Sequence, residues 1–297
     1  MLIAITGATG FLGRYIVNHL IAQGHRCRCW YRPRSDRGGF ADEGKIEWVP
    51  GALNDAKSCD ALVRGADGVV HSALGWTGGL VEYAQTNVVG TLQLMEKAKW
   101  AGAGRFVFIA SCVVHEIILD DRKLDEAHPL SPTSQYGAYK AAIEMFVHSL
   151  GLEDKWGVCS LRPTGIYGLA RPVQKSQWFN LVREVAAGKP IRSSAGGKQV
   201  HAADVAKAVG ILLAAPIQAI AGQVYNCYDL YVADQDIAMI AKRIMDSSSH
   251  IKRLNKGPKH QIDTTKIRQL GMGFGGPALF EQTVGQLVEA VRRELTS

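Results

Sequence analysis

A tyrosine and a lysine stand four residues apart in the run YGAYK (136–140). The surrounding residues, 134–154, predict a helix, on which Tyr136 and Lys140 share one face. A tyrosine with its ordinary pKa of about 10 is a poor base at neutral pH, but an adjacent ammonium favours its phenolate. The pair is therefore a candidate proton-transfer site. The structural alternative is an amphipathic helical tyrosine beside a solvated lysine.

Two further residues near this pair need separate interpretations. Tyr139 is one residue from Lys140, about 100° around the predicted helix, so it is interpreted as a packing residue. Ser111 ends the predicted strand RFVFIAS (105–111). The carboxyl end of that strand should open on the ligand crevice of a parallel sheet, although a serine there also serves to cap a turn.

A glycine-rich run, TGATGFLGR (6–14), directly follows the first predicted strand, LIAIT (2–6). Gly7, Gly10 and Gly13 stand three apart at the start of a helix predicted from Phe11 to Gln23. Glycines there permit a tight turn and let backbone N–H groups and the positive helix end approach a pyrophosphate. The spacing is a variant of the common G-x-G-x-x-G, and its place after a strand predicts nucleotide binding.

The N-terminal half alternates short strands with longer helices, which predicts an α/β fold with a doubly wound parallel sheet, a Rossmann domain. The strands expected after the first are 26–31, 45–49, 68–72, 105–111 and 157–163, and the helices are 11–23, 55–64, 80–101 and 134–154.

Past Gly168 the regular alternation weakens. Helices are expected near 175–187, 204–214, 234–246 and 278–295, with a strand near 223–227. This pattern predicts a smaller, mostly helical substrate-binding lobe. The nucleotide-binding domain is assigned to 1–166 plus 204–232, and the lobe to 167–203 plus 233–297. The charged run 252–260 is interpreted as a solvated surface segment.

Composition limits the classes of protein that the chain could belong to. Its 297 residues are 47% hydrophobic and 21% charged, an ordinary globular mixture. No stretch has the roughly 18 apolar residues of a membrane span, and MLIAITGATG lacks the order of a signal peptide. The six cysteines have neither a disulfide-framework nor a zinc-ligand spacing, so we expect reduced thiols, a cytoplasmic location and no metal site.

The net charge of +7 and the pI of 9.1 raise the question of a polyanionic partner. Part of the positive charge lies in five arginines between 26 and 37, a stretch too short and too poor in stackable aromatics for a nucleic-acid surface. A small phosphorylated ligand is the better interpretation, so no nucleic-acid and no membrane partner is expected.

At this point the sequence resembles the extended branch of the short-chain dehydrogenase/reductase superfamily, the NAD-dependent epimerase/dehydratase family. The resemblance covers essentially the whole chain and extends beyond the glycine run and YGAYK. It is carried by VVHSA (69–73), NVVGT (87–91), FIAS (108–111), LRPTGIYG (161–168) and VHAADVA (200–206). The run YRP (31–33) is similar to the dihydroflavonol reductase group.

The resemblance implies a role for each site residue. Tyr136 transfers the proton, Lys140 lowers its pKa, Ser111 orients the substrate oxygen, and Asn87 organises the site. His71 and His201 match family histidines with structural roles. The implied cofactor-binding residues are Gly7, Thr9, Gly10, Phe11, Leu12, Gly13, Arg32, Arg34, Leu53, Ser72, Ala73, Tyr136, Lys140, Pro163, Thr164 and Ile166.

Arg32 follows the second predicted strand, where members that prefer NAD usually have an acidic residue for the ribose 2′-hydroxyl. Here Arg32 and Arg34 come first and no carboxylate occurs before Asp36. An arginine grips a phosphate with two parallel hydrogen bonds. NADP is therefore the expected cofactor, and NAD is the alternative. If Arg32 does not bind the cofactor, it is a solvated arginine at the end of the strand.

The chain also departs from the family pattern. Ala52 replaces the Asp that contacts adenine, and Cys112 and Val113 replace the acidic pair of the dehydratases, which argues against dehydration. His115 replaces a common Tyr and is interpreted as a surface-loop histidine. Gly197 and Lys198 replace the Arg-Asp pair of nucleotide-sugar enzymes, although Arg171, Lys175 or Lys198 are candidate substitutes.

The prediction is an NADP-dependent oxidoreductase that moves hydride between the cofactor and a carbonyl or alcohol carbon of a small-molecule substrate. The alternatives are a nucleotide-sugar 4-epimerase with the same Ser-Tyr-Lys site and a regulatory protein that senses NADP without turnover. Helices near 80–101 and 134–154 pair between subunits in many relatives, so a homodimer is expected.

Overall fold

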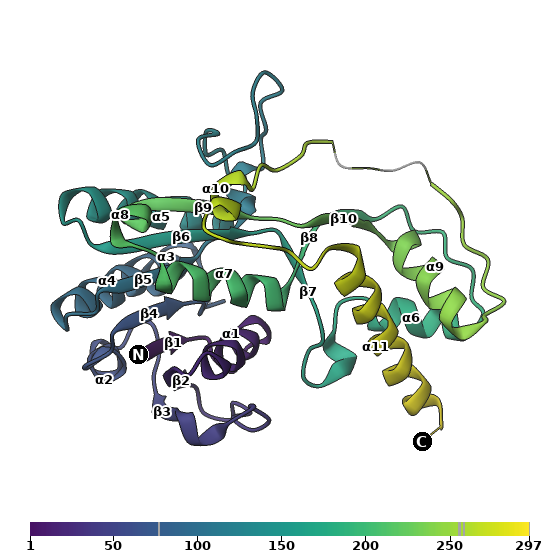
Figure 1. Cartoon of the computed structure of the whole chain (residues 1–297), viewed down its shortest axis with the longest axis horizontal. Coiled ribbons are helices and arrows are strands. Elements are labelled where there is room, and N and C mark those ends of the chain that lie inside the picture. Colours follow the sequence, from purple (N-terminus) through teal and green to yellow (C-terminus); the bar gives the residue numbers. More distant parts are fainter. Residues whose placement is uncertain (77, 255–256, 258, 297) are drawn as a thin grey trace. The chain divides into compact units, whose positions relative to one another are not determined.

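The computed structural model describes every residue except 77, 255, 256, 258 and 297, and it divides into two compact units (Figure 1). The first unit comprises Met1–Pro163, Val205–Cys227 and Ile262–Met272. The second comprises Thr164–Asp204, Tyr228–Gln261 and Gly273–Ser297. Three positions of the charged run 252–260 lie outside the described residues.

The unit boundaries differ from the expected ones mainly near the C-terminus. The prediction placed 233–297 in one lobe, but 262–272 belongs to the first unit. The cause is tertiary, because the Asn226 side chain donates to the Asp263 carbonyl at 3.1 Å and Leu124 forms an isolated parallel bridge with Ile262.

The first unit is built on a seven-stranded parallel sheet of order β3-β2-β1-β4-β5-β6-β9. The order reverses between β1 and β4, which creates a crevice outside their carboxyl ends. The predicted doubly wound Rossmann fold is confirmed. The strands are β1 (Leu2–Thr6), β2 (Arg26–Tyr31), β3 (Ile46–Pro50), β4 (Gly68–His71), β5 (Arg105–Ile109), β6 (Gly157–Pro163) and β9 (Gln223–Cys227).

Helices cover both faces of this sheet because strand side chains alternate between its two sides. Ala4 and Val69 pack in one core with α2 (Ala56–Val63), α4 (Gly90–Trp100) and α5 (Gln135–Glu153). On the other side, Gly68 lies against Ile3 and against Leu213 of α7 (Ala202–Ala214), and α7 approaches α1 (Phe11–Ala22). The short helices α8 (Ile217–Ile220) and α10 (Thr265–Gln269) complete the unit.

One predicted helix is interrupted. The residues expected as a single helix over 80–101 form α3 (Leu80–Ala84), a π-helical stretch (Gln85–Val89) and α4 in continuous succession. Asn87 is fully buried in the π-helical stretch. Such local widening is frequent at functional sites, and here it lies beside the loop that follows β4.

The second unit contains a small sheet that the sequence patterns missed. Its order is β10 (Leu230–Ala233), β8 (Gly196–His201) and β7 (Gly165–Tyr167), with β8 antiparallel to β10 and parallel to β7. These strands are short, and β8 begins with two glycines, so they lack a strand pattern. Around a core that includes Tyr167, Phe179 and Phe280 pack α6 (Phe179–Ala186), α9 (Asp234–Met245) and α11 (Gly276–Thr296).

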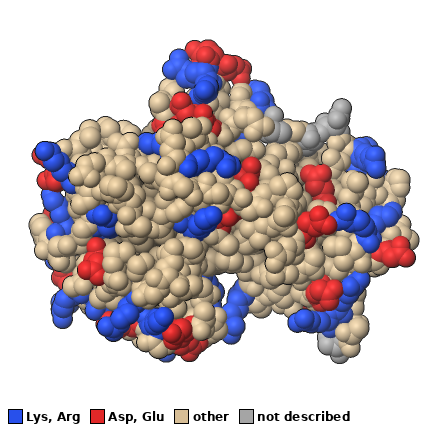
Figure 2. All heavy atoms as spheres, in the orientation of Figure 1, with Lys and Arg blue, Asp and Glu red and all other residues tan. Residues whose placement is uncertain are grey.

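Charged side chains of both signs are interspersed on the face shown in Figure 2. Several surface cations pair with carboxylates, as in Arg28 with Glu47 at 2.9 Å and Lys97 with Asp60 at 3.0 Å. Within the described part of the chain, no helix is both long and apolar enough to span a membrane.

Candidate active site

The glycine run forms a tight turn between β1 and α1. Gly7 has φ of +74°, and a Cβ there would lie 2.7 Å from the Ser72 hydroxyl. A Cβ at Gly13 would lie 2.0 Å from the Gly7 carbonyl oxygen. Gly10 is the N-cap of α1 and has no side chain to accept a hydrogen bond. The first N–H groups of the helix can therefore donate to a ligand.

The ends of β1 and β4 are joined by a small polar cluster. The Thr6 hydroxyl accepts from the backbone N–H groups of Ser72 and Ala73 at 3.2 and 3.1 Å. The Ser72 hydroxyl donates to the Thr6 carbonyl at 2.8 Å. These bonds hold the two loops at the crevice in fixed register.

A cavity of about 550 Å3 lies at this edge of the sheet. It is lined by many of the residues expected to bind the cofactor: Gly7, Thr9, Gly10, Arg32, Leu53, Ser72 and Ala73. Ala52 also lines it, at the position where the family Asp is absent. Sequence reasoning missed the lining residues Trp30, Tyr31, Asn54, Trp76 and Thr86. Trp30 and Tyr31 are the last residues of β2 and directly precede Arg32. This position in the sequence could have identified them as lining residues.

Some expected cofactor contacts lie elsewhere in the described structure. Phe11 and Leu12 are half-buried in the first turn of α1 and do not line the cavity. Arg34 is exposed, with φ of +67°, and is not a lining residue. Pro163 ends β6, whereas Thr164 and Ile166 belong to the second unit. Contact of these residues with a nucleotide stays a prediction.

The segment after β2 is held by a different arginine. Arg14 of α1 donates to the carbonyls of Asp36 and Gly38 at 2.6 and 2.8 Å and pairs with the Asp36 carboxylate at 3.2 Å. The Arg37 guanidinium lies 4.4 Å from the ring centroid of Tyr31. These contacts hold the loop that follows Arg32. Arg37 is a second cation near the cavity, since it contacts the lining residue Tyr31.

Tyr136 lies in the first turn of α5, which Ser134 caps by accepting from the Gly137 N–H at 3.1 Å. Partial burial raises the pKa of Tyr136, and a side-chain hydrogen bond with Ser111 opposes the rise. The lowering of this pKa by Lys140 that the sequence suggested is not among these two effects and stays a prediction. Ser111, which lies two residues after the end of β5, and Tyr136 of α5 do come together.

Lys140 is 4% exposed, and its ammonium donates to the Ile109 carbonyl at 2.7 Å. It lies 4.5 Å from the ring centroid of Phe108 and 5.5 Å from that of Tyr136. Burial lowers the pKa of Lys140 to about 7, and the charge of Glu144 opposes the shift. A backbone carbonyl thus holds the Lys140 ammonium beside the Tyr136 ring.

Asn87 acts on the loop after β4 and not on Tyr136 directly. Its side-chain oxygen accepts from the Gly75 N–H at 2.8 Å, and its amide nitrogen donates to the Gly75 and Tyr83 carbonyls at 2.9 and 3.1 Å. This clamp fixes the backbone next to Trp76, whose indole stacks on the Tyr136 ring with centroids 6.3 Å apart.

Tyr139 and His71 lie in the interior behind these residues. The Tyr139 hydroxyl hydrogen bonds to Thr91 at 3.0 Å, and Tyr139 is 2% exposed, which fits its interpretation as a packing residue. The His71 ring bridges the hydroxyls of Thr6 and Thr91 at 2.6 and 2.9 Å, and its burial lowers its pKa to about 3. His201 belongs to the second unit, where burial lowers its pKa to about 4.

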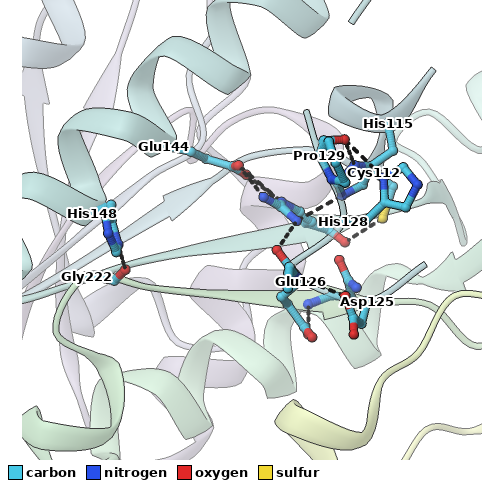
Figure 3. A network of polar contacts seen from close by, with 12 residues as sticks. Cys112, His115, Asp125, Glu126, His128, Pro129, Glu144, His148 and Gly222 are labelled. Atoms are coloured by element: carbon cyan, nitrogen blue, oxygen red, sulfur yellow. Dashed lines mark hydrogen bonds and ion pairs between the residues drawn. The ribbon is translucent and has the colours of Figure 1, made fainter. Parts of the chain in front are cut away.

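The sequence did not predict a polar network that includes His115, Glu126 and the buried Glu144 (Figure 3). Arg162 of β6 donates from Nε and Nη2 to the Glu144 carboxylate at 2.9 and 2.7 Å, and both side chains are almost fully buried. The other end of the guanidinium donates to His115 Nε2 at 2.9 Å and to the Glu126 carbonyl at 3.4 Å. The network ties α5, β6 and the 111–134 loop together.

His115 is not the surface-loop residue expected from the sequence. It is 5% exposed and ends the short helix Cys112–His115 that Ser111 caps. Burial and the Arg162 charge lower its pKa to about 4, and its Nδ1 lies 3.2 Å from the Pro129 carbonyl. The neutral His115 ring therefore accepts a hydrogen bond from Arg162. This hydrogen bond compensates for the burial of the polar ring.

The two residues that follow Ser111 do not provide an acid and a base. The Cys112 thiol donates to the Arg162 carbonyl at 3.1 Å, and burial raises its pKa to about 12. Val113 is apolar. Across the described residues there is also no cluster of His, Cys, Asp or Glu suited to hold a metal ion.

Comparison with known proteins places this geometry in context. The sequence profile of the NAD dependent epimerase/dehydratase family matches residues 3–227. A 3 beta-hydroxysteroid dehydrogenase/Delta 5-->4-isomerase of Mycobacterium tuberculosis is 29% identical over 180 residues, 56% of this chain and 47% of that protein. A putative dihydroflavonol 4-reductase of Synechocystis sp. is 32% identical over 139 residues, 46% of this chain and 40% of that protein. The chain thus spans about half the length of the curated relatives it matches.

Solved structures share the fold at lower sequence identity. The UDP-glucose 4-epimerase of Thermus thermophilus, in complex with NAD, has a TM-score of 0.78 at 19% identity, covering 98% of this chain and 99% of that chain.

Proposed function

Because the chain belongs to the NAD dependent epimerase/dehydratase family, we propose that it is an NADP-dependent oxidoreductase acting on a carbonyl or alcohol substrate. The observation that carries the proposal is the Tyr136 hydroxyl, hydrogen-bonded to Ser111 beside the buried Lys140. All three belong to the unit that contains the glycine turn.

The residues of the crevice fit a dinucleotide. A side chain at Gly7 or Gly13 would collide with Ser72 or with the Gly7 carbonyl, so the turn leaves room only for backbone. The first N–H groups of α1 are donors for a pyrophosphate, and Arg32 is exposed at the cavity wall. A nicotinamide cofactor, when bound, supplies the hydride chemistry.

The chain's own residues move the proton and hold the oxygen. Tyr136 donates to, or accepts from, the substrate oxygen, and Ser111 orients that oxygen and the phenol. Lys140, with a pKa near neutrality, sets the charge beside the phenol. Asn87 positions the adjoining loop through Gly75. The burial of Ser111, Lys140 and Asn87 strengthens their electrostatic effects.

The reaction is tested with a substrate panel. We expect reduction of small ketones and aldehydes, or oxidation of the corresponding alcohols, followed at the absorbance band of the reduced nicotinamide. No interconversion of UDP-glucose and UDP-galactose is expected, because Gly197 and Lys198 replace the Arg-Asp pair. A coupled epimerase assay runs beside the panel, and robust epimerisation without net carbonyl reduction would overturn the proposal.

Arg32 is proposed to select NADP over NAD. A charge-assisted contact with the 2′-phosphate contributes about 1.5–3 kcal/mol, so Arg32→Ala should weaken NADP binding by about 10- to 150-fold. NAD binding should change far less, since NAD presents only a hydroxyl there. Titration of the wild type and the variant with each cofactor measures both effects.

Arg34→Ala is the matched control for Arg32→Ala. Arg34 is likewise exposed on the same segment but does not line the cavity, so its loss should weaken NADP binding less than the loss of Arg32 does. If the wild-type protein bound NAD more tightly than NADP, Arg32 would be a solvent-exposed arginine at the end of β2 that does not select the cofactor.

The proposal also includes location and assembly. All six cysteines are free thiols and five are buried, which supports a reducing cytosol. A homodimer remains part of the proposal, to be tested by the mass of the protein in solution.

A further inference from the structure

Trp76 is a large aromatic residue whose exposure has no structural explanation in the fold. Its side chain is 75% exposed, although an indole buries 150–250 Å2 when it packs. It nevertheless lines the cavity at the crevice and stacks on Tyr136 with an interplanar angle of 18°. The most exposed tryptophan of the described chain therefore lies against the tyrosine proposed to transfer the proton.

The backbone that carries Trp76 is held in place. Both hydrogen-bonding groups of Gly75 bond to the fully buried Asn87 side chain, at 2.8 and 2.9 Å. A Cβ at Gly75 would lie 2.6 Å from the Thr86 methyl group, so the segment packs closely on the π-helical stretch. The clamp accordingly presents the indole at a defined place while most of its surface stays open.

Two exposed apolar side chains follow Trp76 in the chain. Leu80 and Val81 begin α3 and are 64% and 70% exposed. Cationic groups, which would favour a phosphorylated substrate, are absent from the described lining residues between 72 and 86. Beside the Trp76 indole, this part of the lining consists of small, aliphatic, neutral polar or acidic residues: Ser72, Ala73, Leu74, Gly75, Glu82, Gln85 and Thr86.

We propose that Trp76 determines substrate specificity by holding a flat, apolar body of the substrate, aromatic or fused-ring, against its indole. The carbonyl oxygen of such a substrate then meets Tyr136 and Ser111. The inference rests on the proposed oxidoreductase function and deepens it by naming the substrate class. Aromatic pairs prefer offset or edge contacts at 4.5–7 Å, the range in which Trp76 already contacts Tyr136.

The test compares two ketones that differ by one fused benzene ring, 2-tetralone and cyclohexanone. Trp76→Ala should lower kcat/KM for 2-tetralone about 10-fold, mainly through KM, and that for cyclohexanone less than about threefold. Trp76→Phe keeps an aromatic plane and should recover most of the loss. Trp100→Ala removes a similarly exposed indole, 69%, at the end of α4 and should change neither ketone.

Calorimetric binding of 2-tetralone to the NADP-saturated protein separates this proposal from the proposed function. Binding that Trp76→Ala weakens about 10-fold, without turnover in the wild type, would support the platform and contradict the oxidoreductase. Equal loss for both ketones in Trp76→Ala would show that Trp76 only steadies Tyr136. Equal loss, unchanged 2-tetralone affinity, or no ketone binding to the wild type would overturn the inference.

Discussion

Tyr136→Phe should abolish turnover while the affinity for NADP stays within about threefold of the wild type. The variant loses only the hydroxyl that hydrogen bonds to Ser111, and the phenyl ring keeps its contact with Trp76. Positioned acid or base groups contribute about 10²- to 10⁴-fold to a rate, so kcat should fall by a factor of at least about 10². Steady-state rates with the best ketone of the substrate panel, and a parallel cofactor titration, give both quantities.

Tyr139→Phe is the matched control on the same helix. Tyr139 is 2% exposed, and its hydroxyl contacts Thr91 in the interior, away from Ser111. The variant loses one buried hydrogen bond, a cost of about 1 kcal/mol in stability, and should keep substantial activity. If the two variants lost activity equally, Tyr136 would not be the proton-transferring residue.

Glu144→Gln should lower the free energy of unfolding by about 3–5 kcal/mol, since it leaves the Arg162 guanidinium buried without its counter-charge. Glu144 is 0% and Arg162 2% exposed, so water does not compensate for the lost carboxylate. Urea unfolding at fixed pH measures the change. The substitution also removes the charge that raises the pKa of Lys140, so the alkaline limb of the rate profile, where the Lys140 ammonium loses its proton, should shift to lower pH.

Two variants define the origin of this loss. Glu153→Gln, at an exposed position near the end of the same helix, should change stability by less than about 0.5 kcal/mol. The double variant Glu144→Met, Arg162→Met removes both charges together and should recover much of the loss, because apolar replacement of a buried pair is often neutral. A Glu144→Gln protein as stable as the wild type would contradict the buried ion pair.

Residues that lie close together in one element were predictable from the sequence. The glycine turn follows from the strand before it and the helix after it, and Tyr136 and Lys140 share a face because a helix has 3.6 residues per turn. The handedness of strand-helix-strand crossovers then restricts the topology, which is why the seven-stranded sheet could be anticipated.

Local patterns were misleading where packing of distant segments decides the outcome. The sequence around His115 is typical of a surface loop. In the structure His115 is buried, and its ring accepts a hydrogen bond from Arg162 of β6. The three short strands of the second unit pair with one another without an alternating pattern of their own. Residues 262–272 join the first unit through contacts with Asn226 and Leu124.

The sequence by itself determined the family of folds, the tight turn at Gly7–Gly13, and the candidates Ser111, Tyr136 and Lys140, because residue type and regular spacing set local geometry. Only the tertiary structure decided that burial lowers the pKa of Lys140 to about 7 and that Glu144 and Arg162 pair behind it. It alone brought Trp76 onto Tyr136, 60 residues away in the chain. Desolvation and contacts between elements depend on how the whole unit packs, which no short stretch of sequence encodes.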